Sequence, residues 1–283
     1  MTVAVDVSTY TALTDKPVLN GVRRGLMFGS QITPYMCAHC PPGREPRDET
    51  TDLFSEIATS HPSKNRPWVT LTYAQSLDGC IAPQRGQGFI LSSRESLAVT
   101  HRLRAAHDAI LVGIGTILAD NPRLTVRLAP GEDPQPVVLD RQLRFPVETP
   151  LLQEHPKTPW IVTGKDGQAS RQHALETAGA EVVRLSSNPK GHIELPDLLE
   201  HLVRRGIRKL MVEGGAHVIT SFLSHRVVDR LVLTLAPLLL GGLRAVGTLS
   251  EHDGAPLPRL HNLRCQWLGD DILLWGEPIW DDE

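Results

Sequence analysis

A glycine-rich segment that follows an apolar run has the residue types of a nucleotide site. The run Ala109–Val112 is followed by Gly113 and Gly115, and glycines let backbone N–H groups approach a ligand closely. Thr116 and Asp120 come next, and their spacing of four residues places them on one face if the chain turns helically. The segment lacks the third glycine of the Gly-x-Gly-x-x-Gly fingerprint, so it predicts a nucleotide site of a different kind.

A second glycine pair, Gly214 and Gly215, stands between an apolar strand pattern and an expected helix over Ala216–Leu223. The first N–H groups of such a helix have no internal partners, and together with the helix dipole they attract phosphate. The alternative is that the glycines only allow a tight turn from strand to helix. Both interpretations fit the residues.

Other motifs give little evidence for metal binding or catalysis. Cys37 and Cys40 have the spacing of half a zinc site, but no second cysteine pair follows, so we expect no metal. Asp78, in a Ser-Leu-Asp-Gly stretch, is better explained as a turn residue than as a catalytic one. No hydrolase or P-loop motif occurs in the sequence.

The elements that position these residues alternate along the chain. Apolar runs and polar–apolar alternation predict strands over Val69–Tyr73, Ala109–Val112, Pro136–Leu139, Trp160–Thr163, Glu181–Leu185, Lys209–Val212 and Val228–Leu235. Helical patterns cover Leu97–Ala106, Arg171–Ala178, Asp197–Arg205 and Ala216–Leu223, and a closing hairpin is expected over Trp267–Trp275. Strands separated by helices indicate an α/β fold whose central sheet is mainly parallel, has helices on both faces and is made mixed by the hairpin.

Three polar segments follow predicted strands: Gly113–Asp120, Asp140-Arg141 and Glu213–Val218. The carboxyl ends of parallel strands lie at one edge of a sheet, where open α/β folds bind ligands. We therefore expect these segments to line one crevice. Arg141 is placed to pair with a 2′-phosphate, whereas Asp140 beside it is the alternative partner for a 2′-hydroxyl.

Composition narrows the class of protein. The chain has 283 residues, 41% hydrophobic residues, 5% aromatic residues and a formal net charge of −3. This balance offers no basic footprint and few stacking rings for nucleic acid. No apolar run reaches the roughly 18 residues that a membrane helix needs. With four cysteines and no signal pattern at Met1–Asp6, a cytoplasmic location is the default expectation.

The chain divides into two parts of different character. Residues 1–66 form an N-terminal extension, rich in turn formers and charge around Pro41–Glu49, with a short helix expected over Asp52–Ala58. Residues 67–283 carry the alternating pattern and form the main domain. We expect the extension to lie on this domain and to make few contacts with its core.

Four motifs in order resemble those of the riboflavin-biosynthesis reductase family: Thr70–Gly79, Leu103–Gly113, Thr116–Pro122 and Met211–Ala216. The resemblance covers residues 67–277 and is strongest to the stand-alone type of fungi and archaea. It implies a dihydrofolate-reductase-like three-layer fold, NADPH as hydride donor and a homodimer. It also implies that the substrate is 2,5-diamino-6-ribosylamino-4(3H)-pyrimidinone 5′-phosphate, whose ribosylamino side chain is reduced to ribitylamino.

Carried onto matching positions, the resemblance implies two sets of site residues. The cofactor would be held by Ala74, Thr116, Asp120, Arg141, Gly214, Gly215, Ala216, His217 and Val218. The substrate would be held by Arg104, Leu124, Arg127 and Glu213, with the two arginines on its phosphate. No residue is assigned as the catalytic proton donor.

Structural alternatives stay open for several of these residues. Asp120, which precedes Asn-Pro, is also suited to end a turn. Arg104 and Arg127 are also explained as surface charges, and Glu213 as an ordinary acid at a strand end.

Bacterial relatives in the family carry a zinc deaminase domain, which needs His-x-Glu followed by a Pro-Cys-x-x-Cys motif. The His-x-Glu at His192–Glu194 has no cysteine pair after it, so we expect no deaminase here. This favours a pathway in which reduction precedes deamination. Three alternatives remain: a bacterial-type reductase of the deaminated pyrimidine, another reductase such as a dihydrofolate reductase, and a non-catalytic nucleotide-binding module.

Overall fold

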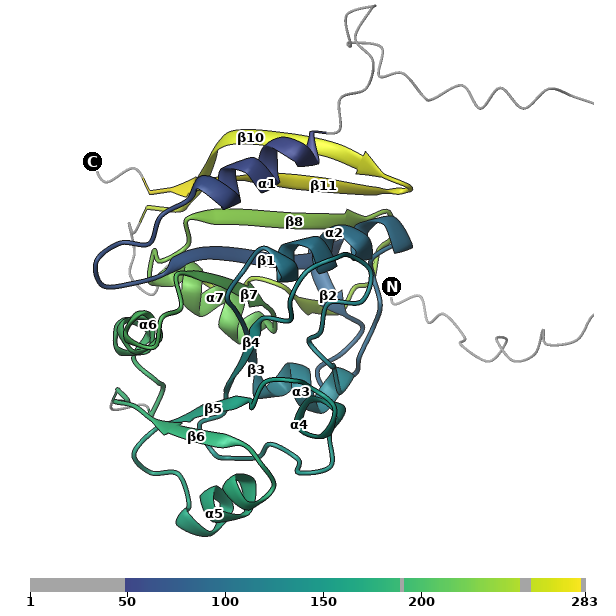
Figure 1. The fold of residues 1–283 in the computed structure, drawn as a ribbon. Helices are drawn as coiled ribbons and strands as arrows, with labels where there is room; N and C mark the ends of the chain where they lie inside the picture. Colours follow the sequence, from purple (N-terminus) through teal and green to yellow (C-terminus); the bar gives the residue numbers. More distant parts are fainter. Residues whose placement is uncertain (1–48, 189–190, 250–255, 281–283) are drawn as a thin grey trace, which may run out of the picture. The chain divides into compact units, whose positions relative to one another are not determined.

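A nine-stranded sheet organises the computed structural model, which describes residues 49–188, 191–249 and 256–280. The strands are β1 Trp68–Ser76, β2 Cys80–Ala82, β3 Ala109–Gly113, β4 Gln135–Leu139, β5 Trp160–Thr163, β6 Glu181–Arg184, β7 Lys209–Glu213, β8 Arg230–Ala236, β9 Leu243–Arg244, β10 Arg259–Leu268 and β11 Asp271–Ile279. The helices are α1 Thr50–Thr59, α2 Arg94–Ala105, α3 Ile114–Asp120, α4 Pro150–Gln153, α5 Ala169–Thr177, α6 Leu195–Arg204 and α7 Ala216–Ser224. The strand order is β10-β11-β8-β1-β7-β3-β4-β5-β6, with β2 and β9 in a separate small sheet (Figure 1).

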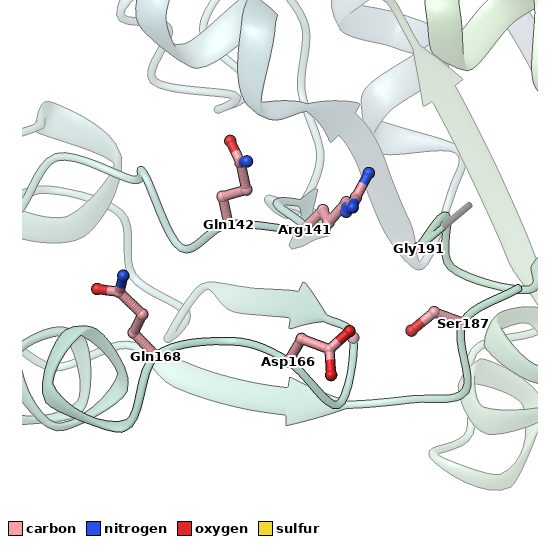
Figure 2. A pocket seen from close by; sticks show the side chains of 7 residues that line it. Arg141, Gln142, Asp166, Gln168, Ser187 and Gly191 are labelled. Carbon is pink, nitrogen blue, oxygen red and sulfur yellow. The ribbon is translucent and has the colours of Figure 1, made fainter. Parts of the chain in front are cut away.

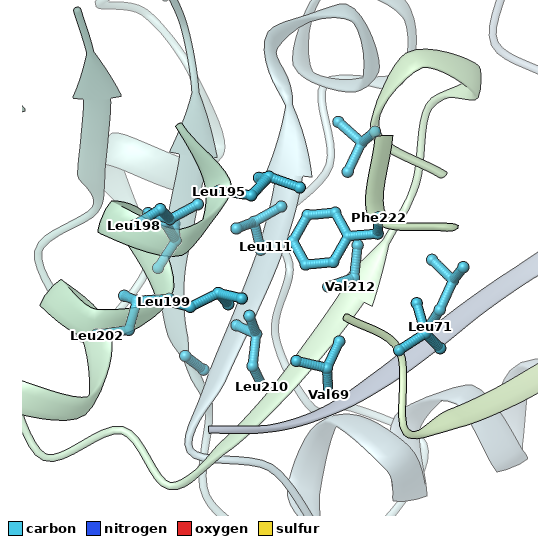
Figure 3. Packing of buried hydrophobic residues seen from close by; sticks show 14 of the residues in the cluster. Val69, Leu71, Leu111, Leu195, Leu198, Leu199, Leu202, Leu210, Val212 and Phe222 are labelled. Atoms are coloured by element: carbon cyan, nitrogen blue, oxygen red, sulfur yellow. The ribbon is translucent and has the colours of Figure 1, made fainter. Parts of the chain in front are cut away.

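The central strands are buried on both faces, which explains their continuous apolar sequences. Within β3, Leu111 packs against α6 and α7, whereas Ile110 belongs to the core on the opposite side. Figure 3 shows the first of these cores, where Leu111 and Val212 of the sheet meet Phe222 of α7 and leucines of α6. Residues of α1 to α5 contribute to the opposite core. The three-layer arrangement predicted from the sequence is therefore confirmed.

The sheet is mixed, as predicted from the closing hairpin. Strands β8, β1, β7, β3, β4, β5 and β6 pair in parallel, while β11 is antiparallel to β8 and β10 is antiparallel to β11. The hairpin is longer than the predicted Trp267–Trp275, because β10 begins at Arg259 and β11 ends at Ile279. Most of β10 is exposed, and its register shifts between His261 and Arg264. A strand with one solvated edge and an irregular register shows little polar–apolar alternation, so its full extent was missed.

Helix α1 corrects the prediction that the N-terminal extension makes few core contacts. Leu53 and Ile57 are 0% and 1% exposed and belong to the same core cluster as Trp275 of β11. Glu56 lies 2.8 Å from Arg230 of β8, which is 5% exposed and also lies 3.2 Å from Glu277. Figure 1 shows α1 running along the β10–β11 hairpin. The compact unit accordingly begins at Asp48, whereas the boundary at residue 66 stays a prediction.

Two features predicted from the sequence fall on residues that the structure does not describe. Cys37, Cys40 and the turn-rich segment from Pro41 to residue 48 lie outside the described residues. In the part of the chain that the structure describes, no helix is long and apolar enough to cross a membrane.

The packing of α1 predicts a stability difference between two positions on the same helix. Leu53→Ala should lower the free energy of unfolding by about 2–5 kcal/mol, because it removes a fully buried side chain from the core. Ser55→Ala on the exposed face is the matched control and should change it by less than about 0.5 kcal/mol. Urea unfolding measures both. Equal midpoints for the two variants would show that α1 does not stabilise the domain.

Candidate active site

The three polar segments lie at one edge of the sheet, as the sequence predicts. Strands β7, β3 and β4 are parallel neighbours, so the chain leaves each of them on the same side. Glu213–Gly215 follows β7, α3 follows β3, and Asp140-Arg141 follows β4. Strand β1 continues to Ser76, beyond its last pair with β7, Thr72 with Glu213, and half-buried Ala74 lies two residues past that pair at this edge. Ligands bind at such edges in open α/β sheets.

Thr116 of α3 lies directly against the glycine pair that follows β7. Gly214 and Gly215 have φ angles of +104° and +80°, which favour glycine. A Cβ atom on either residue would lie 3.4 Å or 3.3 Å from the Thr116 hydroxyl oxygen. The Thr116 side chain thus brings together two turns that lie about 100 residues apart in the sequence. We call the space formed by Thr116, Gly214 and Gly215 the cradle; side chains at the two glycine positions would fill it.

Helix α7 starts immediately after the cradle, at Ala216, and Gly215 at its N-cap supplies no side-chain hydrogen bond. The first-turn N–H groups of Ala216, His217 and Val218 are therefore free of a side-chain cap, as a phosphate site requires. Val218 is buried, and its methyl group would lie 2.9 Å from a Cβ atom on Gly113. Close packing of α7 on the β3–α3 turn keeps the two halves of the cradle together.

Glu213 is held by a two-pronged ion pair with Arg104 of α2. The Arg104 Nε and Nη2 groups donate to the two Glu213 carboxylate oxygens at 2.9 and 2.6 Å, and Nη1 donates to the Thr125 carbonyl at 3.0 Å. Arg104 is 8% exposed, so it is not the surface charge of the alternative interpretation. Its guanidinium is largely occupied by protein acceptors.

Asp120, on the same helical face as Thr116, stands close to this pair. Burial raises the pKa of Asp120, and the negative charge of Glu213 raises it further. A ligand that hydrogen-bonds to this exposed carboxylate would therefore meet an acid whose charge is disfavoured by a second acid nearby. The two acids and Arg104 give the edge a concentrated set of charges.

Arg127 belongs to a group of cations next to the ion pair. Burial, Arg104 and Arg123 all lower the pKa of Arg127, so bringing an anion here would relieve repulsion. The Arg127 side chain is exposed and donates from Nη1 to the Thr125 hydroxyl at 2.7 Å. Its backbone N–H donates to His101, whose pKa is lowered to about 4 by burial and by Arg104 and Arg127. His101 is thus a neutral structural acceptor.

Leu124 differs from the other predicted substrate residues. Its side chain is 1% exposed and lies in the core that contains α2 and α3. Its φ of +56° shows that the chain turns sharply at this point. Only the Leu124 backbone is available to line a ligand site.

Arg141 lies apart from the cradle, in a cavity of about 280 Å³ at the carboxyl ends of β4 to β6 (Figure 2). The lining residues are Arg141, Gln142, Gly164, Asp166, Gln168, Ser187 and Gly191. A Cβ atom on Gly191 would lie 2.5 Å from the Arg141 guanidinium, so glycine leaves room for that group. No local pattern in the sequence connects Asp166 with β4, so its place in this cavity was not predicted.

The alternative role for Asp140 is wrong. Its side chain is 0% exposed, and Oδ2 accepts a hydrogen bond from the Phe145 N–H at 2.7 Å. Burial raises the pKa of Asp140. The residue closes the turn after β4 and has no exposed atom with which to hold a ribose hydroxyl.

Asp78 has the turn role that the sequence favours. Its carboxylate accepts hydrogen bonds from the Leu240 and Gly241 N–H groups at 3.0 and 2.6 Å. The Ser76 hydroxyl also donates to it, and these three hydrogen bonds hold the pKa of Asp78 well below its usual value. Asp78 therefore ties the β1–β2 turn to the segment after β8.

Metal ligation has no geometric support in the described ranges, which contain no group of three or more His, Cys, Asp or Glu placed to hold an ion. The polar groups that the structure shows at this edge belong to the cradle, the Arg104–Glu213 pair, Asp120 and the cavity around Arg141.

Comparison with known proteins identifies the family of this chain. Residues 67–274 match the model of the RibD C-terminal domain. The chain is 38% identical over 216 residues to the 2,5-diamino-6-ribosylamino-4(3H)-pyrimidinone 5′-phosphate reductase of Methanothermobacter thermautotrophicus, covering 74% of this chain and 97% of that protein. It is 32% identical over 232 residues to the riboflavin biosynthesis protein RibD of Aquifex aeolicus, covering 82% of this chain. The chain spans only 62% of the length of that Aquifex relative.

Among solved structures, the riboflavin biosynthesis reductase Rib7 of Saccharomyces cerevisiae superposes with a TM-score of 0.64. The match has 27% sequence identity and covers 82% of this chain and all of that one. Family model, relatives and fold agree, and the chain belongs to the RibD C-terminal domain family.

Proposed function

We propose that this protein is a reductase of riboflavin biosynthesis, which uses NADPH to reduce the ribosylamino side chain of 2,5-diamino-6-ribosylamino-4(3H)-pyrimidinone 5′-phosphate to ribitylamino. The observation that carries the proposal is the cradle of Thr116, Gly214 and Gly215 beside the Arg104–Glu213 pair. Archaeal relatives with this reductase name, from Methanothermobacter and Archaeoglobus, are covered over 97% and 83% of their length.

The cofactor fits the cradle on steric and electrostatic grounds. Glycines at 214 and 215 leave the backbone open, and the uncapped first turn of α7 offers N–H donors to phosphate. Thr116 supplies a hydroxyl and Asp120 a carboxylate on the neighbouring helix. When bound, a reduced nicotinamide supplies a hydride, so the chain mainly has to orient two ligands.

The proposed reaction requires no covalent bond between the substrate and the protein. A ribosylamine opens to an imine at C1′, with the ring oxygen taking up a proton. Addition of hydride to C1′ and of a proton to nitrogen then gives the ribitylamine, a two-electron reduction. In this proposal Glu213, fixed by Arg104, orients the substrate at the sheet edge, and Arg127 binds its phosphate.

A second candidate is reduction of the deaminated pyrimidine. It is favoured by the match to the Aquifex RibD protein, which extends over 82% of this chain. A non-catalytic nucleotide-binding module is a third, but a chain that keeps both the cradle and the Arg104–Glu213 pair retains the features that catalysis would need.

Oxidation of NADPH with the two purified pyrimidine phosphates tests the proposal. We expect kcat/KM for the diamino compound to exceed that for its deaminated analogue by at least about tenfold, which corresponds to about 1.4 kcal/mol of selective transition-state binding. The reverse preference would support the second candidate. No turnover of either compound, with NADPH still bound, would support the non-catalytic module.

The two arginines next to Glu213 should respond differently to substitution by lysine. Arg127→Lys should lower kcat/KM for the phosphorylated substrate by about 10- to 100-fold and affect the dephosphorylated substrate little, because lysine lacks the planar fork that binds phosphate. Arg104→Lys should impair both substrates to a similar extent, since Arg104 holds Glu213 through both carboxylate oxygens.

Exposed Arg259 in β10 offers a matched control, and Arg259→Lys should leave both activities unchanged. A phosphate-selective loss in the Arg104 variant would instead return this residue to the phosphate site. Equal losses on both substrates in the Arg127 variant would remove Arg127 from it.

The cavity around Arg141 predicts cofactor preference. Arg141→Ala should raise KM for NADPH by about tenfold and barely change KM for NADH, because only NADPH carries the 2′-phosphate that an arginine would pair with. Arg144→Ala, at an exposed position three residues along the same turn, serves as the comparison. An equal rise for both cofactors in the Arg141 variant would indicate a structural role.

We also propose that the protein forms a homodimer in the cytoplasm. The exposed strand β10 presents Trp267 and Leu263, which are 66% and 55% exposed, at the end of the sheet. Large apolar side chains on an edge strand are typical of association surfaces. Sedimentation of the wild type and of Trp267→Asp tests this part of the proposal, and a monomeric wild type would refute it.

A further inference from the structure

The loop between β2 and α2 bridges the two sides of the cradle. The Arg85 Nη1 group lies 3.0 Å from Nε2 of His217, in the first turn of α7. Three residues later, a Cβ atom on Gly88 would lie 2.4 Å from an Asp120 carboxylate oxygen and 2.9 Å from the Ala119 carbonyl oxygen. One short loop therefore touches the start of α7 and the end of α3.

The cradle has no positively charged side chain of its own to bind a pyrophosphate. The cradle and its neighbours include one acid and no permanent cation; these residues are Thr116, Gly214 and Gly215 of the cradle, and Asp120, Ala216, His217 and Val218 beside it. The neighbouring Arg104 directs its fork at Glu213. A dinucleotide pyrophosphate carries two negative charges, and backbone N–H groups at a helix start contribute only partial positive charge. A guanidinium beside His217 would complete the site.

We propose that Arg85 binds the pyrophosphate of the cofactor, an assignment that rests on the proposed function. The His217 ring accepts through Nε2 when it is neutral, so the contact uses one of the five guanidinium N–H donors of Arg85. Both side chains are exposed, and the remaining donors are available to phosphate oxygens at the N-terminus of α7. The close fit of Gly88 over Asp120 keeps the loop, and with it Arg85, on the cradle.

A surface contact between Arg85 and His217 with no ligand role would contribute little to stability or binding. The two cases differ in cofactor affinity, which is measured without turnover. Titration of NADPH by calorimetry, at low and at high salt, should be done with the wild type, Arg85→Ala, Arg85→Lys and the control Arg259→Ala. Arg259→Ala removes the same charge from an exposed position on β10, at the opposite end of the sheet from β4 to β6.

We expect Arg85→Ala to raise Kd for NADPH about tenfold at low salt and less at high salt, because salt screens an exposed charge. Arg85→Lys keeps the charge and should lose about threefold, and Arg259→Ala should match the wild type. A Kd for Arg85→Ala within twofold of the wild type, or an equal change in Arg259→Ala, would overturn the assignment. Failure of the wild type to bind NADPH would instead overturn the proposed function, and this inference with it.

Discussion

The parallel pairing of β3 with β7 is the constraint on which the site depends. It brings the β3–α3 turn and the β7–α7 turn side by side, so that Thr116 rests on Gly214 and Gly215. A Cβ atom at either glycine would touch the Thr116 hydroxyl oxygen, at 3.4 or 3.3 Å, and the positive φ angles of both residues would strain any other residue type. Since the same two turns begin α3 and α7, the position of each helix start follows from this contact.

The second organising interaction is the ion pair of Arg104 with Glu213. Arg104 is buried and Glu213 is partly buried, and such a pair is tolerated only when its geometry and hydrogen bonds compensate for desolvation. The two-pronged contact and the Thr125 carbonyl supply that compensation. The pair also joins α2 to the end of β7. In the proposed function Glu213 faces the substrate, so the same residue holds these two elements together. Site and fold are therefore coupled through one carboxylate.

The sequence predicts the parts of this structure that local pattern determines. Strands β3 and β7 are buried on both faces, and their unbroken apolar runs show it. Thr116 and Asp120 share a face because helical spacing alone places them there. Glu213, the partner of Arg104, lies 109 residues away in sequence. The ion pair, which occupies the Arg104 guanidinium, could therefore not be predicted from local sequence. Helix α1 was placed on a loosely attached extension, because Leu53 and Ile57 reveal burial only once the hairpin they pack on is in position. The alternative role for Asp140, as a partner of a ribose hydroxyl, failed for the same reason, since its acceptor role depends on a turn that returns to it at Phe145.

The strand order also separates the cradle from the cavity around Arg141. The cradle lies after β3 and β7, whereas the cavity around Arg141 lies after β4, β5 and β6. Neighbouring strands are about 4.8 Å apart, so three strand intervals from β7 to β5 span about 14 Å. In the proposed function, this distance suits a dinucleotide along the sheet edge, with its pyrophosphate near α7 and its adenosine end in the cavity. The two halves of the ligand would then meet different chemistry: backbone N–H groups and a loop arginine at one end, and a guanidinium in a cavity at the other.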